Sequence, residues 1–213
     1  MSARRAHGGA DPRCVAEVPG NVAVYFPSFA MLDDLVPRAR ASPAVFSCGW
    51  VVQARGMDEA LREEALRQLS SDGPPRVLCA VLGGVFAEGV DLPPGALDAV
   101  IVVGPALPPV GLERDLLREH YEGRFGEGFR LASLVPGLTR VVQAAGRLIR
   151  RPEDRGVVVL MDRRFRWRDV LALLPEGWDP QVAADPVSEI RGFFERDPEG
   201  VAPDPIGGPG AVE

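Results

Sequence analysis

Lysine is absent from this sequence, and all 24 of its lysine-or-arginine positions hold arginine. The phosphate-binding loop G-x-x-x-x-G-K-[ST] needs its lysine to reach the phosphates of a bound nucleotide. The chain by itself therefore cannot build a loop of this kind.

Cysteine is also scarce, and Cys14, Cys48 and Cys79 are widely spaced. Without a C-x-x-C pair, a disulfide framework, a zinc site or an iron–sulfur cluster within the chain is not expected. The longest apolar run, around residues 99–112, is interrupted by prolines and falls short of the about 20 residues that cross a bilayer. No signal peptide is evident at the start of the sequence. We expect a soluble, cytoplasmic protein that makes no use of a membrane.

The 213 residues fit one domain with tails, and a hydrophobic content of 46% can form a packed core. The net charge of −6 implies that any polyanion would bind to a local basic patch. We predict a flexible segment at residues 1–19 and a folded domain at residues 20–182. A short helix and a disordered tail rich in glycine and proline are expected at residues 183–213.

Apolar runs and helical patterns alternate along the predicted domain. Strands are expected at residues 22–26, 44–48, 76–82, 97–104 and 156–162, and helices at about residues 29–40, 57–71, 113–124 and 140–150. Several of these strands lack polar alternation, which is typical of a parallel sheet covered by helices on both faces. The fold class is therefore α/β, and binding residues are expected at the carboxyl ends of the strands.

One group of candidate residues lies on the last predicted helix of the domain. Gln143, Arg147 and Arg150 are spaced to share one helix face. Gly146 lies between them at a cost of about 1 kcal/mol relative to alanine, which suggests that something approaches the backbone there. The planar fork of arginine suits a phosphate. A solvated basic face would explain the same spacing.

A second group lies in the glycine-rich segment GGVFAEGVDLPPG at residues 83–95. Gly83 and Gly84 allow a tight turn whose backbone N–H groups can face a ligand. Glu88 and Asp91 could pair with the arginines, accept a ribose hydroxyl or coordinate an ion through water. An ordinary connection between a strand and a helix is the alternative.

Two further features have two interpretations each. Ser28 is placed to cap a helix, and from the positive end of that helix it could also contact a nucleic-acid phosphate. The two roles are compatible. Four arginines near the end of the domain form either a patch that faces nucleic acid or a solvated surface: Arg163, Arg164, Arg166 and Arg168.

Three segments occur in a telling order: YFPSF at residues 25–29, the glycine-rich segment at 83–95, and QAAGRLIRRPEDRGVVVLMDRRF at 143–165. Together they resemble motifs IV, V and VI of the DinG/XPD-like branch of superfamily 2 DNA helicases. The resemblance extends over about residues 20–178. It implies a RecA-like second motor lobe, with a helical insertion before the last helix–strand unit.

The resemblance also implies roles for the candidate residues. Arg147 and Arg150 would stabilise charge on the γ-phosphate of ATP, with Gln143 and Gly146 beside the nucleotide. Glu88 and Asp91 would couple the nucleotide to DNA and orient the arginines. The backbone of single-stranded DNA would contact four residues after the strands: Ser28, Gly83, Gly84 and Phe86. ATP with Mg²⁺ would be held mainly by a first lobe, the only place for an iron–sulfur cluster, and no residue of this chain is expected to bind a metal.

Two functional hypotheses follow. The first is the second lobe of an ATP-dependent DNA helicase that moves 5′ to 3′ and is inactive without a first lobe, in cis or in trans. It would then be the C-terminal part of a longer helicase, a truncated product, or a half with a separately encoded partner. The second is a free-standing module that binds nucleic acid or protein. The oligomeric state is left open.

Overall fold

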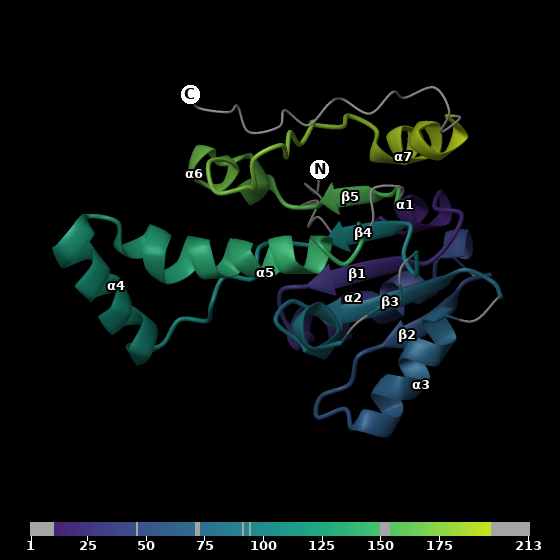
Figure 1. Ribbon diagram of the computed structural model, residues 1–213, viewed down its shortest axis with the longest axis horizontal. Coiled ribbons are helices and arrows are strands. Elements are labelled where there is room, and N and C mark those ends of the chain that lie inside the picture. Colours follow the sequence, from purple (N-terminus) through teal and green to yellow (C-terminus); the bar gives the residue numbers. More distant parts are fainter. Residues whose placement is uncertain are drawn as a thin grey trace, which may run out of the picture.

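The computed structural model describes residues 11–45, 47–70, 73–90, 92–93, 95–149 and 154–196. Within them lies one five-stranded sheet with the order β2-β3-β1-β4-β5, in which every neighbouring pair is parallel (Figure 1). Its strands are β1 (Val22–Phe26), β2 (Gly49–Val52), β3 (Arg76–Val81), β4 (Ala99–Val102) and β5 (Val157–Leu160). The α/β class and the parallel sheet are confirmed.

The α-helices are α1 (Pro12–Ala16), α2 (Phe29–Arg40), α3 (Glu59–Ser70), α4 (Leu112–Phe125), α5 (Val135–Ala145), α6 (Arg168–Leu171) and α7 (Pro186–Glu195). Two short 3₁₀ helices, η1 (Pro43–Val45) and η4 (Arg163–Arg166), and two π-helical turns, η2 (Val85–Gly89) and η3 (Arg130–Leu134), complete the described elements.

Helices cover both faces of the sheet. Because successive side chains of a strand point to opposite sides, each strand contributes to a core on each face. Ala23 and Tyr25 of β1 belong to the core that also contains buried residues of α3 and α5. Val22, Val24 and Phe26 belong to a second core with buried residues of α1, α2 and α7. The central strand β1 is buried throughout, whereas all four residues of the edge strand β5 are only half-buried.

The predicted helical insertion is formed by α4 and η3, which lead directly into α5. None of the residues of α4 is buried, and the helix stands away from the sheet at the far end of α5 (Figure 1). Packing of α4 is confined to its neighbourhood, where Gly128 donates its N–H to Glu122 Oε2 at 2.8 Å. The insertion therefore adds surface to the domain without adding to the sheet.

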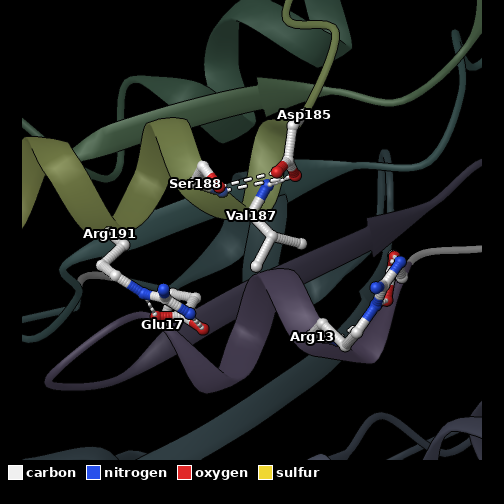
Figure 2. A network of polar contacts seen from close by, with 7 residues as sticks. Arg13, Glu17, Asp185, Val187, Ser188 and Arg191 are labelled. Carbon is white, nitrogen blue, oxygen red and sulfur yellow. Dashed lines mark hydrogen bonds and ion pairs between the residues drawn. The ribbon is translucent and has the colours of Figure 1, made fainter.

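The first and last described helices, α1 and α7, are joined side by side (Figure 2). Nε and Nη2 of Arg191 donate to the two carboxylate oxygens of Glu17 at 2.8 and 2.7 Å. Asp11 and Asp185 cap the two helices with their side chains. Cys14 of α1 is fully buried. The loose segment expected at 1–19 is thus structured from Asp11 onward, because apolar side chains of α1 complete the second core; residues 1–10 and 197–213 lie outside the described residues.

One predicted strand was wrong. Within the segment 44–48, residues up to Val45 belong to the 3₁₀ helix η1, and the strand begins at Gly49. The N–H of Gly49 donates to the carbonyl of Pro75 at 3.0 Å, which starts the pairing with β3. Val45 still packs in the core, at 1% exposure, but from a turn. Among the described residues of this segment Val45 alone is buried, so the apolar run predicted the burial of that residue but not the secondary structure.

The helix predicted at 140–150 lies earlier, at Val135–Ala145. Pro136 and Gly137 favour the end of a helix in the sequence pattern, but proline is tolerated in the first turn of a helix, where Pro136 lies. Gly137 packs against the backbone of Ala106, where an added Cβ would lie 3.1 Å from the carbonyl oxygen. Gly146 is the C-cap, so the helix ends before Arg147.

Candidate functional site

The loops that follow the strands meet at one edge of the sheet, because all the strands are parallel. β1 has β3 and β4 as its neighbours, so the residues after these strands lie next to one another. Ser28 follows β1, Gly83 follows β3, Gly104 follows β4 and Asp162 follows β5. The expectation that candidate residues gather at the carboxyl edge therefore fits the fold.

The glycine turn after β3 is held in place from below by Gln53. This side chain is 6% exposed, and its Oε1 accepts the N–H of Val81 at 3.1 Å. A Cβ at Gly84 would lie 2.7 Å from Gln53 Nε2, so glycine is needed there for close packing. Gly83 has φ +75°, a conformation that residues with a Cβ rarely adopt. The chain then enters the π-helical turn η2.

Arg147 projects from the turn after α5 onto this loop. Its Nε donates to the carbonyl of Ala87 at 3.0 Å, and its Nη1 donates to the carbonyl of Val90 at 2.9 Å. The guanidinium is thereby fixed against the segment that carries Glu88. The prediction that Arg147 and Gln143 share a helix face was wrong, since α5 ends at Ala145; the tertiary contact instead sets the position of Arg147.

Glu88 makes its ion pair with an arginine that the sequence did not single out. Oε1 of Glu88 lies 3.9 Å from Nε of Arg140, and both side chains are 42% exposed. Gln143 is exposed in the last turn of α5, and Gly146 is exposed at its C-cap. Arg150 and Asp91 lie outside the described residues.

Ser28 is exposed and caps α2. Its Oγ accepts the N–H of Met31 at 3.3 Å. A hydroxyl that accepts a hydrogen bond still has its own proton to donate. The capping role predicted from the sequence is confirmed, and the hydroxyl keeps the capacity to bind an anion.

Phe86 needs a correction. Its side chain is 0% exposed within the core, so it cannot contact DNA by stacking or by its edge. The Phe86 carbonyl accepts the hydroxyl of Tyr25 at 3.1 Å. Burial raises the pKa of that tyrosine far above its usual value, while the charge of Arg147 acts weakly in the opposite direction. Phe86 anchors the loop on β1 and does not face solvent.

Asp162 and Arg164 follow β5 and form one end of the candidate site. Nε and Nη2 of Arg164 donate to the two carboxylate oxygens of Asp162 at 3.0 and 2.9 Å. Burial alone would raise the pKa of Asp162, but the hydrogen bonds from Arg164 outweigh it and hold the pKa below its ordinary value. Gly104 makes room for the pair, since an added Cβ would lie 3.3 Å from Nη2 of Arg164 and from Oδ2 of Asp162. Arg164 is therefore committed to a structural pair, while Arg163, Arg166 and Arg168 are exposed.

Two residues of the site, Gln53 and Arg140, were not predicted from the sequence. A single glutamine after the apolar run GWVV is a faint signal that it packs at a strand end. Arg140 lies seven residues before Arg147, a spacing that on one continuous helix would place both arginines on the same face, but its contact with the 83–90 segment depends on packing.

The model of the helicase C-terminal domain family matches residues 12–181. This chain belongs to that family. It is 31% identical over 199 residues to the regulator of telomere elongation helicase 1 homolog of Drosophila persimilis, covering 84% of this chain and 20% of the relative. The Caenorhabditis briggsae homolog is 30% identical over 179 residues, covering 72% of this chain and 18% of the relative. The chain spans about a fifth of the length of these curated relatives.

Solved structures agree on the fold. An XPD helicase superposes with a TM-score of 0.60 at 24% identity, covering 81% of this chain and 31% of that chain. An apo form of XPD superposes with a TM-score of 0.60 at 22% identity, covering 82% of this chain and 36% of that chain. The resemblance to the C-terminal lobe of DinG/XPD-like helicases and the RecA-like fold are confirmed.

No helix in the described part of the chain is long and apolar enough to cross a membrane. Among the same residues, no three histidine, cysteine, aspartate or glutamate side chains are grouped as a metal would need.

Proposed function

We propose that this chain is the second motor lobe of an ATP-dependent DNA helicase. In this role Arg147 and Arg150 face the γ-phosphate of an ATP molecule that is held mainly by a first lobe. Ser28 and the main chain of Gly83 and Gly84 contact the backbone of single-stranded DNA. The family match over residues 12–181 supports the assignment to a helicase lobe.

The contact between Arg147 and the 85–90 segment carries the proposal. Its two bonds to the carbonyls of Ala87 and Val90 couple the position of the guanidinium to the conformation of the loop. That loop begins at the glycine turn proposed to contact DNA. A shift of the loop on DNA binding would therefore move the arginine that stabilises the transferring phosphoryl group. Glu88, Asp91, Gln143 and Gly146 belong to the same proposed nucleotide side.

Dependence on a first lobe follows from the composition. With no lysine, this chain cannot supply the phosphate-binding loop of such motors. We propose that the first lobe, in cis or in trans, supplies that loop and the residues for Mg²⁺. The 213-residue chain alone should show no ATPase activity with or without DNA.

The test is DNA-stimulated ATPase activity of the complete gene product with Arg147→Ala. A γ-phosphate-facing arginine of this kind contributes about 10³-fold or more to kcat, so stimulated hydrolysis should fall to background. Nucleotide affinity should fall much less than kcat, and circular dichroism should show an unchanged fold. Arg38→Ala is the matched control. It removes an exposed arginine in the last turn of α2, at the end of that helix away from Ser28. Wild-type ATPase activity in Arg147→Ala would overturn the role of Arg147.

A further inference from the structure

Arg140 of α5 lies over the glycine turn after β3. A Cβ at Gly83 would lie 3.1 Å from Nε of Arg140 and 3.3 Å from its Cζ. The guanidinium therefore rests directly on the Gly83 backbone. Because Gly83 has no side chain, a ligand that reaches this turn can contact both the backbone and the arginine.

The pairing of Arg140 with Glu88 is loose. The 3.9 Å between Nε and Oε1 is longer than a hydrogen bond, and 42% of each side chain is open to water. Water screens such a pair strongly. Arg164 differs, since it is held by two bonds to Asp162 at 3.0 and 2.9 Å. Arg140 can therefore exchange its partner at little cost, which suits a residue that binds an incoming anion.

We propose that Arg140 is a phosphate-binding residue and that Glu88 is its resting partner, displaced when the phosphate arrives. The phosphate is either a phosphodiester of single-stranded DNA or a phosphate of the nucleotide, and both present the oxygens that an arginine fork binds. This inference rests on the proposed function, because it assumes that DNA and ATP meet at this edge. It adds a residue that is not among those assigned to the nucleotide from the sequence on this segment, namely Gln143, Gly146, Arg147 and Arg150.

Two variants of the complete gene product separate phosphate binding from a structural ion pair. Arg140→Gln should weaken binding of an oligothymidylate about tenfold or weaken binding of a non-hydrolysable ATP analogue by a similar factor. Glu88→Gln should have the opposite sign and tighten binding of the same ligand, because it releases Arg140 from its competitor. Arg38→Gln removes an arginine of the Arg38–Asp34 pair on α2 and should change neither affinity.

The two sources of phosphate give different results. If Arg140 contacts DNA, the slope of log affinity against log salt for the oligothymidylate should fall by about 0.7 in Arg140→Gln, with nucleotide affinity unchanged. If Arg140 contacts the nucleotide, the analogue binds more weakly in the absence of DNA, and the salt slope for DNA is unchanged. Either pattern supports the proposal.

Three results would overturn it. Parallel weakening in Arg140→Gln and Glu88→Gln would show a structural pair. Wild-type affinities in Arg140→Gln would exclude a phosphate contact and leave the proposed helicase function intact. A wild-type protein that binds neither ligand would overturn the proposed function and this inference together. If Arg140→Gln does not fold, the sign of the Glu88→Gln effect decides the question.

Discussion

Nε of Arg147 donates a hydrogen bond to the carbonyl of Ala87 at 3.0 Å, between positions 60 residues apart in the sequence. The preceding carbonyl, that of Phe86, accepts the buried hydroxyl of Tyr25. The π-helical turn η2 is thus attached to the central strand on one side and to the arginine on the other. This arrangement makes the loop a physical link between the proposed nucleotide side and the glycine turn.

Replacing Gly83 by alanine should destabilise the domain. The positive φ of +75° strains any residue with a Cβ, and that Cβ would also press on Arg140 at 3.1 Å. We expect a loss of about 1–2 kcal/mol in the free energy of unfolding, measured by urea denaturation. Gly123→Ala on the exposed helix α4 is the control, because nothing lies within 4 Å of the added Cβ. This variant should gain about 0.5–1 kcal/mol in the free energy of unfolding. Equal effects at both sites would contradict this account.

Ser28 allows its capping role and its proposed DNA contact to be separated. Ser28→Ala removes the acceptor for the Met31 N–H and should cost about 1 kcal/mol of stability. Ser28→Asp restores a good cap but places a negative charge at the DNA-binding edge. The aspartate variant should therefore keep its melting temperature and lose affinity for single-stranded DNA. If it binds DNA as well as wild type does, Ser28 is a cap only.

Asp98 should oppose folding at neutral pH. It is half-buried, and desolvation raises the pKa of its carboxyl above the ordinary value of 3.8. For an acid with a raised folded-state pKa, stability is greatest at low pH and falls as the pH rises through that pKa. Asp98→Asn should therefore gain roughly a few tenths of a kcal/mol near neutral pH, since water still screens the group. In chemical denaturation the gain should vanish below about pH 3; a gain that is constant with pH would refute the desolvation argument.

Asp162 should show the opposite pH dependence. Burial disfavours its charged form, yet the bonds from Arg164 outweigh this and lower its pKa below 3.8. The stability that it contributes is present above the ordinary pKa of aspartate and is lost as the pH falls through the folded-state value. Asp162→Asn keeps a cap for η4 but loses the paired bonds to Arg164, which should cost about 1 kcal/mol near neutral pH. Denaturation curves of the two proteins should converge in acid, and a difference that persists there would contradict the lowered pKa.

The order of the elements could largely be predicted from the sequence, because it follows from local apolar patterns. The strand at Val22–Phe26 and the helix at Phe29–Arg40 have the predicted bounds. The segment 44–48 did not form the predicted strand, since a short apolar run after proline can be buried in a turn as well as in a sheet. Helix α5 began five residues earlier than predicted, because a proline that usually stops a helix also fits its first turn.

The candidate site was predicted less completely. Glycine at 83 and 84 and serine at 28 are local requirements of a turn and a cap, and the sequence indicates them directly. Phe86 was assigned to a DNA contact although it is fully buried, because a motif gives the position of a residue but not the direction of its side chain.

The sequence by itself determined the alternation of apolar strands and helices, the glycine turn and the helix caps, since each depends on residues within a few positions. Only the tertiary structure decided which groups meet at the carboxyl edge. Arg147 with Ala87 and Arg191 with Glu17 join positions 60 and 174 residues apart. Such contacts arise when helices pack on a sheet of fixed strand order, and no local spacing encodes them.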